Sequence, residues 1–479
     1  MTAAADPRRW KALAVLGVAY LMVVLDVSIV NVALPSIQTD LGFKPEDLQW
    51  VVSGYALTFG GFLLLGGRIG DLLGRRRLFM VGLASFALFS LLAGLSTSPE
   101  MLIAMRLLQG AAGAVLSPSV FSIVSVTFAE GSDRNKALGI LGAIAGSGAA
   151  IGVLLGGVLT SYVGWEWIFF VNVPIGLGAL FLVPRFVNES RADGLTRHFD
   201  TLGAATVTGG LMLLVYGLTQ TTNYGWTSVR TLGAMLAALV LLGAFILIEF
   251  RSRSPLMPLS FFRHRTPAAA NLIGFGLGTV VFGMFFLLSL YQQQVLGFSA
   301  METGFGYLAV ALTAVAASGL AQALVTKIQV KKVLAAGMAL LTFGLLWFTQ
   351  VSPDGSYPVD LLPGFLLIGV GLGFSFVPVS IAALAGITNR EAGLASGLIN
   401  TSQQIGGAVG LAVLATVSTS RTEDLLGKGT PAPEALTTGF TAAFWVAAAI
   451  AAASFVVTLV ALRSRDLKVQ EGQAVPVPA

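Results

Sequence analysis

Long apolar runs alternate with short polar segments along almost the whole chain. A helix needs about 20 apolar residues to cross the hydrocarbon core of a bilayer. By that standard the chain contains about fourteen candidate membrane spans. Their approximate ranges are 12–34, 48–67, 78–96, 101–126, 137–162, 166–186, 201–220, 229–249, 267–290, 303–326, 332–350, 360–386, 392–418 and 436–462. The pattern predicts an all-α, polytopic membrane protein with about fourteen transmembrane helices.

The basic residues test this count, because the cytoplasmic loops of membrane proteins carry an excess of lysine and arginine. With the N-terminus placed in the cytoplasm, 23 of the 28 Lys and Arg residues fall in cytoplasmic segments. The expected outer loops hold only Lys44, Arg230, Arg421 and Lys428, and Arg106 lies inside a span. A miscounted helix would invert this pattern downstream, and no inversion occurs. We therefore expect both termini to be cytoplasmic.

Composition narrows the possible functions. Hydrophobic residues make up 55% of the chain and charged residues only 11%, against about 25% charged residues in an ordinary soluble domain. There is no cysteine, and the two histidines, His198 and His264, lie in expected loops, which argues against a metal centre. The sequence lacks the phosphate-binding G-x-x-x-x-G-K-[ST] pattern and the H-E-x-x-H and G-x-S-x-G patterns. We expect no cofactor, no metal and no enzymatic activity.

Two polar linkers divide the predicted helices into groups of six, two and six. The linkers cover about 187–200 and 251–267, and a helical hairpin lies between them. The predicted units are an N-terminal six-helix bundle over 1–190, a two-helix hairpin with flanking loops over 191–266, a C-terminal six-helix bundle over 267–465 and a disordered cytoplasmic tail over 466–479. A six-plus-six arrangement is typical of transporters whose substrate site lies between the halves.

One acid and one base lie well inside predicted spans. Asp26 belongs to the first span and Arg106 to the fourth. At about 1.5 Å per residue they lie about 12 Å and about 8 Å below the outer ends of their helices, so their side chains can meet. Charges at such depth are costly and are usually kept for function. Burial disfavours a carboxylate whereas a nearby arginine stabilises it, so the pair could bind and release a proton. The alternative is a static ion pair that only fixes helix packing.

A glycine-rich motif follows the second span. It has the pattern G-x-x-x-D-x-x-G-R-x-R, formed by Gly67, Asp71, Gly74, Arg75 and Arg77. The glycines permit a tight cytoplasmic turn. Asp71 could cap a helix or pair with an arginine and so latch the two halves together. The alternative is a topology signal that consists of positive charge alone.

Small residues gather on one face of the fifth span. Gly148, Gly152, Gly156 and Gly157 lie at spacings that let another helix approach closely. The run lies inside a span and lacks the Lys-Ser/Thr of a phosphate-binding loop, so a nucleotide site is excluded.

Several polar residues also lie inside spans. They could line a central substrate cavity, and hydrogen bonding between helices is an equally good interpretation for each of them. The candidates are Asn31, Tyr55, Gln109, Asn172, Asn400 and Gln403.

Together these motifs resemble the major facilitator superfamily, and specifically its fourteen-span drug:proton antiporters. The resemblance is carried by LDVSIVNVALP at 25–35, GRIGDLLGRRR at 67–77, LIAMRLLQG at 102–110, WEWIFFVNVP at 165–174 and GLASG at 393–397. It implies a major facilitator fold, proton-coupling roles for Asp26 and Arg106, and a gating role for 67–77. The helix 5 motif of these antiporters ends in G-P-x-x-G-G, and here Val153 stands in place of the proline.

The resemblance also implies a function. We expect a monomeric antiporter of the bacterial inner membrane that exports small amphipathic organic compounds, such as drugs or antibiotics, in exchange for protons by alternating access. Its expected partners are that substrate, protons and the lipid bilayer, with no nucleic acid. The sequence leaves two alternatives open: an exporter of a physiological metabolite such as an amino acid, a peptide or a siderophore, and a membrane receptor or scaffold without transport.

Overall fold

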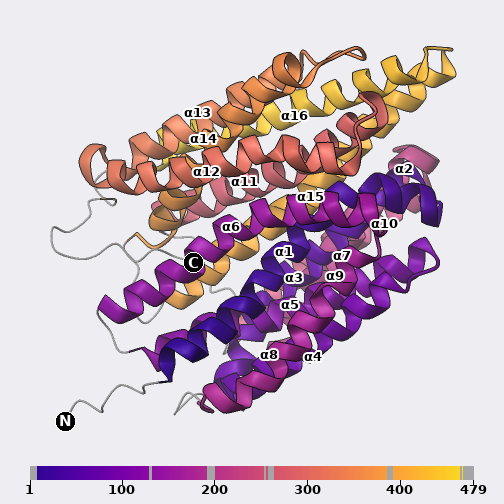
Figure 1. Ribbon diagram of the computed structural model, residues 1–479. Helices are drawn as coiled ribbons and strands as arrows, with labels where there is room; N and C mark the ends of the chain where they lie inside the picture. Colours follow the sequence, from indigo (N-terminus) through magenta and orange to yellow (C-terminus); the bar gives the residue numbers. More distant parts are fainter. Residues whose placement is uncertain are drawn as a thin grey trace, which may run out of the picture.

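The computed structural model describes residues 8–128, 132–190, 200–252, 255–256, 264–385, 392–463 and 467. This described part folds into long helices that run roughly parallel to one another (Figure 1). The helices are α1 (Arg9–Leu41), α2 (Pro45–Leu48), α3 (Trp50–Leu73), α4 (Arg75–Gly94), α5 (Pro99–Thr127), α6 (Ser132–Tyr162), α7 (Trp167–Phe170), α8 (Asn172–Phe186), α9 (Thr201–Tyr224), α10 (Val229–Arg251), α11 (Arg265–Leu290), α12 (Ala300–Ile328), α13 (Val330–Phe348), α14 (Leu362–Ala383), α15 (Ala392–Gly427) and α16 (Ala432–Ala461), with π-helical turns η2 (Tyr291–Val295) and η3 (Tyr357–Leu361).

Within the described residues, eleven helical segments are long and apolar enough to cross a membrane. Three further helices, α3, α6 and α15, contain 24, 31 and 36 residues but are not among the eleven. The predicted all-α, polytopic fold is therefore confirmed, whereas the count of fourteen spans stays a prediction.

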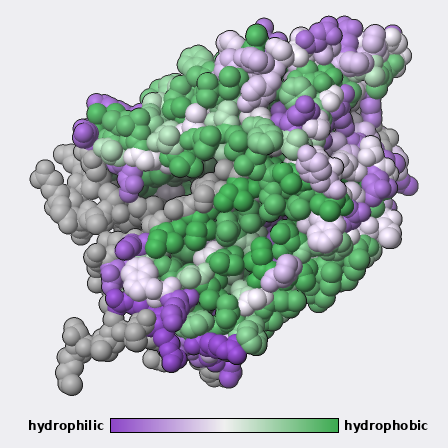
Figure 2. All heavy atoms as spheres, in the orientation of Figure 1, coloured by the Kyte–Doolittle hydropathy of each residue, from purple (hydrophilic) through white to green (hydrophobic). Residues whose placement is uncertain are grey.

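The surface fits a lipid environment. Hydrophobic residues cover the middle of the face seen in Figure 2, and hydrophilic residues gather towards its ends. On α10, Leu236, Leu239 and Phe250 expose 64%, 63% and 72% of their surface. Exposed apolar area of this kind is rare on soluble monomers and is expected where a helix faces lipid.

The starts of α1, α6 and α13 and the end of α16 lie at one end of the bundle (Figure 1). There Arg9 forms an ion pair with Asp133 at 2.6 Å, which joins the first turns of α1 and α6. At the same end, Lys331 Nζ donates to the carbonyl oxygens of Leu459 and Leu462 at 2.7 and 3.0 Å. We call this the basic end, and the opposite one the outer end, in keeping with the predicted orientation.

The helices associate in groups. Among the early helices, α3 packs on α5, α4 on α5 and α1 on α6, and among the late ones α11 packs on α15 and α14 on both α12 and α13. The hairpin helices α9 and α10 pack mainly on each other. The division into six, two and six helices stays a prediction, because residues 191–199 and 257–263 and all of 466–479 except Leu467 lie outside the described residues.

Two pairs of helices join the early and the late group. Helix α6 packs on α12, and α3 packs on α15 with α9 lying against both. The hydrogen bonds found between the two groups in the described part are all near the outer end. They join Gln293 Nε2 to the carbonyl oxygen of Val32 at 2.9 Å, Gln294 Nε2 to Gln38 Oε1 at 2.7 Å, and the amide of Met301 to Ser161 Oγ at 3.1 Å. We refer to these three contacts as the outer closure.

Candidate functional site

A buried ion pair lies inside the early group of helices. Arg106 Nη1 on α5 donates to Asp26 Oδ2 on α1 at 2.6 Å. The side chain of Asp26 is 0% exposed and that of Arg106 is 1% exposed. Removing two charges from water costs several kcal/mol per ion, so such a pair persists only when further hydrogen bonds satisfy it.

Arg106 is held by four groups besides Asp26. Its Nε donates to the carbonyl oxygen of Val51 at 2.9 Å, and the same Nη1 donates to Gln109 Oε1 at 2.7 Å. The guanidinium carbon lies 4.5 Å from the ring centre of Tyr55 and 5.6 Å from that of Phe169. Aromatic faces attract cations, and more strongly where water is excluded. The charge of Arg106 is thus stabilised within the protein.

The second oxygen of Asp26 is also fully engaged. Gln109 Nε2 and Asn172 Nδ2 donate to Asp26 Oδ1 at 2.8 and 2.9 Å. Both amides also donate to Ser90 Oγ, at 3.2 and 3.0 Å, and Ser90 Oγ donates to the carbonyl oxygen of Phe169 at 2.9 Å. The network therefore ties α1 to α4, α5 and the start of α8.

Close packing of α3 on α5 brings the third wall of this site into place. A Cβ added at Gly110 of α5 would collide with Thr58 Oγ1 and the carbonyl oxygen of Tyr55. Thr58 Oγ1 donates to the carbonyl oxygen of Leu107 at 2.7 Å. Without a side chain at Gly110, α3 comes near enough for its backbone and for Tyr55 to contact Arg106.

The polar residues expected either in a cavity or in contacts between helices fall into two classes. Gln109 and Asn172 are 0% exposed, and Tyr55 is 1% exposed. All three belong to the network around Asp26 and Arg106, so they bond or stack between helices.

The remaining three candidates lie outside that network. Asn31 Nδ2 donates to the carbonyl oxygen of Val27 in its own helix at 3.1 Å, and its Oδ1 has no partner within the described part. Asn400 and Gln403 are partly exposed on α15. Gln403 packs against α11, where Gly274 and Gly278 leave room for it.

The turn between α3 and α4 is organised by Glu189. Gly74 has φ 118°, a conformation that side chains disfavour, and a Cβ there would lie 2.8 Å from Glu189 Oε1. The backbone amides of Arg76 and Arg77 donate to the two carboxylate oxygens of Glu189 at 3.1 and 3.2 Å. The amide of Arg75 bonds the carbonyl oxygen of Ser190 at 3.0 Å. The carboxylate thus caps the first turn of α4, where the helix dipole favours negative charge.

The other members of this motif are less fully defined. Asp71 lies in the last turn of α3, and its side chain lies outside the described part. Gly67 packs on Pro118 of α5, where an added Cβ would make ordinary contact at 3.4 Å. The glycine therefore lies against α5, and the motif's gating role stays a prediction.

The glycines of α6 pack against two helices. A Cβ at Gly148 would lie 2.9 Å from Val24 Cγ1, one at Gly152 would collide with Ser28 Oγ, and one at Gly156 would lie 2.7 Å from the carbonyl oxygen of Ile29. These three therefore face α1.

On another face of α6, the neighbour is α12. A Cβ at Gly157 would lie 2.8 Å from the carbonyl oxygen of Ala300. The helix is unbroken at Val153, whose carbonyl oxygen lies 2.7 Å from the Cβ position of Gly304. Helix α6 is thus sandwiched between the helix that carries Asp26 and the late group.

Sequence reasoning missed Ser90 and Glu189. Ser90 is a single hydroxyl within a predicted span, where serine is common, and only its position between two amides sets it apart. Glu189 lies in a predicted linker some 110 residues from the arginines that it contacts. The one available signal was that Glu189 and the arginines at 75–77 both belong to predicted cytoplasmic segments.

Comparison with known proteins identifies the family. A family model for the Major Facilitator Superfamily matches residues 16–411. The chain belongs to the Major Facilitator Superfamily. Major facilitator relatives include the puromycin resistance protein pur8 of Streptomyces alboniger, which is 38% identical over 95% of this chain and 91% of its own length. The cephamycin export protein CmcT of Amycolatopsis lactamdurans is 41% identical over 86% of this chain and 85% of its own length.

Solved structures agree with the major facilitator fold. A POT family peptide transporter superimposes with a TM-score of 0.70 at 15% identity and covers 98% of this chain and 99% of its own. A bacterial homologue of the human lysosomal transporter Spinster gives a TM-score of 0.66 at 16% identity, over 97% and 98%. This major facilitator protein is thus a membrane transporter whose relatives confer antibiotic resistance or export antibiotics.

Proposed function

We propose that this protein is a proton-coupled antiporter that exports small amphipathic organic compounds across the bacterial inner membrane by alternating access. The observation that carries the proposal is Asp26, a fully buried carboxylate whose ion-pair partner among the described side chains is Arg106. The puromycin resistance protein and the cephamycin exporter among the relatives support the substrate class. The proposal includes cytoplasmic termini and a monomer.

In this proposal Asp26 is the proton carrier. As a carboxylate it accepts one charged and two neutral hydrogen bonds. A proton on Asp26 would remove the charge that holds Arg106 Nη1, while Nε would keep its bond to Val51. Because the carboxylate has no exposed surface here, proton exchange needs a rearrangement that admits water.

The same helix can transmit the protonation state. Ser28 and Ile29 lie two and three residues beyond Asp26 and pack into the glycine face of α6. Helix α6 in turn packs on α12 at Gly157. A shift of α1 that follows protonation would therefore press on the helix pair that joins the two groups. We assign a gating role at the basic end to the motif at 67–77, together with Glu189, whose carboxylate caps the turn within that motif.

The outer closure must open before substrate can leave on the outer side. Three hydrogen bonds join the two groups near the outer end, so an outward-facing state requires those bonds to break. Each neutral bond contributes about 1 kcal/mol, which substrate binding can offset. Release on the outer side and proton uptake from it would then occur in the same open state.

Transport into inverted membrane vesicles tests the proposal, with an imposed pH gradient and puromycin as the probe. We expect Asp26→Asn to lose about 90% or more of gradient-driven uptake, because asparagine cannot carry the proton. Asp40→Asn is the matched control: it is an acid on the same helix whose carboxylate accepts from Trp165 Nε1 at 2.8 Å. Full gradient-driven uptake by Asp26→Asn would refute proton coupling through this residue.

A further inference from the structure

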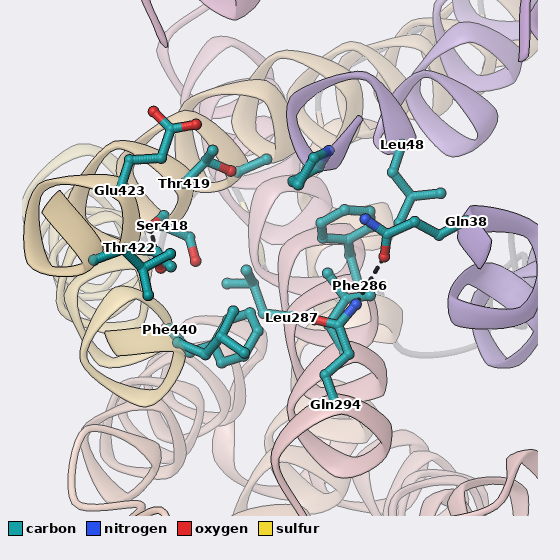
Figure 3. A pocket seen from close by; sticks show the side chains of 15 residues that line it. Gln38, Leu48, Phe286, Leu287, Gln294, Ser418, Thr419, Thr422, Glu423 and Phe440 are labelled. Carbon is teal, nitrogen blue, oxygen red and sulfur yellow. Dashed lines mark hydrogen bonds between the residues drawn. The ribbon is translucent and has the colours of Figure 1, made fainter. Parts of the chain in front are cut away.

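A pocket of about 260 Å³ lies at the outer end, between the early and the late group of helices. Its walls come from the end of α1 and from α2 on one side, and from α11, η2, α15 and α16 on the other. Figure 3 shows Gln38 and Gln294 facing each other along one edge, joined by the hydrogen bond that belongs to the outer closure. The pocket therefore lies directly at that closure, about as far as possible from the basic end.

The interior of the pocket is apolar. Phe286, Leu287 and Phe440 line it in Figure 3, and Leu48 of α2 lies beside Phe286. These side chains are at most 5% exposed. Removing an apolar ligand surface from water here gains roughly 25 cal/mol per Å².

One carboxylate stands at the rim. Glu423 lines the pocket near the end of α15, and in Figure 3 its carboxylate is directed away from Phe440 and Leu287. Glu423 lies five residues beyond the predicted span 392–418. Burial, and after it the charge of Glu46, raises the pKa of Glu423 above its usual value. Its negative charge is therefore poorly compensated.

The basic side chains near Glu423 in the sequence form ion pairs with another acid. Asp424 forms ion pairs with Lys428 at 2.7 Å and Arg421 at 3.3 Å. Within the described part, neither cation forms an ion pair with Glu423. The charge of Lys44 acts on Asp47 of α2, whose pKa it lowers against the larger effect of burial. An apolar pocket with an uncompensated carboxylate at its rim favours a ligand with an apolar body and one positive charge.

We propose that this pocket is a binding site for an amphipathic organic cation, with its amine beside Glu423 and its apolar part against Phe286, Leu287 and Phe440. The inference rests on the proposed function in one respect, that the outer side is the side of release. Ligand pockets usually measure about 300–1,000 Å³. The pocket therefore takes a small amine, or the amine-bearing end of a larger compound.

The position of the pocket gives the ligand an effect on the transport cycle. Both groups of helices supply its walls, so separating them at the outer end would take Leu48 away from Phe286. A ligand that needs both walls binds the closed arrangement better and shifts the population towards it. An amine that accumulates outside would accordingly slow its own export.

Binding to the purified full-length protein tests the site without transport. The probes are phenylpropylamine, a cation at neutral pH, and phenylpropanol, its neutral counterpart, with affinities from saturation-transfer NMR. We expect Glu423→Gln to weaken amine binding about five-fold and to leave the alcohol unchanged, as for loss of a partly exposed ion pair. The matched control is Glu434→Gln, which changes an exposed acid in the first turn of α16 outside the pocket lining and keeps wild-type binding of both probes.

A second variant tests the location. Thr419→Trp places a large ring at a partly exposed position of the lining and should abolish binding of both probes, while an unchanged melting temperature shows that the protein is folded. Equal amine affinity in Glu423→Gln and wild type, or undiminished binding in folded Thr419→Trp, would overturn the proposal. The binding assay uses neither a pH gradient nor transport, so a failure of this site and a failure of proton coupling, which is measured with Asp26→Asn in vesicles, give different results.

Discussion

Asp26 and Arg106 are more than a pair, because Arg106 Nη1 and Asp26 Oδ1 each bond to further side chains. Gln109 contacts both ions: its Oε1 accepts from Arg106 and its Nε2 donates to Asp26. Ser90 in turn accepts from the amides of Gln109 and Asn172. A proton bound to Asp26 would therefore alter a hydrogen-bond network that includes residues of α4, α5 and α8 as well as α1.

The geometry at Arg106 predicts that lysine cannot replace it. Lysine offers a single ammonium, which cannot reach Asp26, Gln109 and the Val51 carbonyl from one position. We expect Arg106→Lys to reduce gradient-driven uptake of puromycin at least about tenfold although the charge is kept. Uptake in inverted vesicles measures this effect, with Arg185→Lys on the exposed end of α8 as control. Near-normal uptake by Arg106→Lys would mean that charge alone is sufficient.

Substitutions of Tyr55 distinguish the contribution of ring stacking from that of hydrogen bonding. Its ring lies 4.5 Å from the guanidinium carbon of Arg106, while its hydroxyl has no partner within the described part. We expect Tyr55→Phe to keep transport within about two-fold, and Tyr55→Leu to lose the cation–π contribution of about 1–2 kcal/mol. Melting temperatures and uptake of the two variants provide the comparison. The opposite order of the two variants would point to an essential hydroxyl.

At this scale the sequence predicts which charges can meet, but not what surrounds them. Depth along two helices indicated that Asp26 and Arg106 lie at similar levels, because helical rise is regular. The partners Ser90 and Glu189 could not be predicted in the same way. Their importance depends on helix rotation and on a contact between distant segments, and neither leaves a periodic signal in one sequence.

Among the elements, helix α6 is central because it packs on both α1 and the late group of helices. One face of it receives α1, and another packs on α12 of the late group. Glycines make both approaches possible, because van der Waals packing between helices in a membrane improves as backbones come closer. Helix α6 therefore links α1 to the late group, in addition to the direct hydrogen bonds that α1 makes at the outer closure.

Gly156 is the position where this packing can be tested most directly. A Cβ there would lie 2.7 Å from a backbone oxygen of Ile29, which cannot move aside as a side-chain end could. We expect Gly156→Ala to destabilise the protein by about 1–3 kcal/mol, the usual cost of overpacking. Thermal melting in detergent measures it against Gly178→Ala on α8, where no atom lies within 4 Å of the Cβ position. Equal melting temperatures would show that α1 and α6 can separate freely.

The extent of the elements was only partly predictable. The first apolar run, 12–34, became a helix from Arg9 to Leu41, and the run 392–418 became a helix that ends at Gly427. Hydropathy marks the part of a helix that lies in lipid, whereas the polar turns beyond it continue the same hydrogen bonds in water. The short helices α2 and α7 and the outer pocket, which α2 helps to form, left no such mark.

For the whole molecule, the outer closure makes a prediction about alternating access. The chain contains no cysteine, so introduced thiols react without background. The side chains of Gln38 and Gln294 meet at 2.7 Å across the two groups. We expect cross-linking of the Gln38→Cys, Gln294→Cys double variant with a bifunctional methanethiosulfonate reagent to block puromycin export at least about tenfold, because a linker as long as the two glutamine side chains would prevent separation at this end.

Export should return when the cross-link is reduced with dithiothreitol. The two single-cysteine variants serve as controls and should keep export after treatment with the same reagent. Continued export by a fully cross-linked double variant would contradict a transport cycle that opens this closure.

Helix α9 is bonded to both groups of helices at their shared seam. Thr219 accepts from Gln49 Nε2 at 2.9 Å on the early side, and the carbonyl oxygen of Leu218 accepts from Thr416 Oγ1 at 3.3 Å on the late side. Gly61 of α3 faces Thr208 of α9. The seam between α3 and α15 is thus crossed by a third helix.

The other seam is not covered in this way. In Figure 1, α6 and α12 lie at the front, with no third described helix across them. A compound dissolved in one leaflet of the bilayer would meet three helices at the seam on one side of the protein and two at the seam on the other. Lateral exchange between lipid and transporter is therefore expected to be one-sided, and bulky lipids or detergents should compete with hydrophobic substrates only at the α6–α12 side.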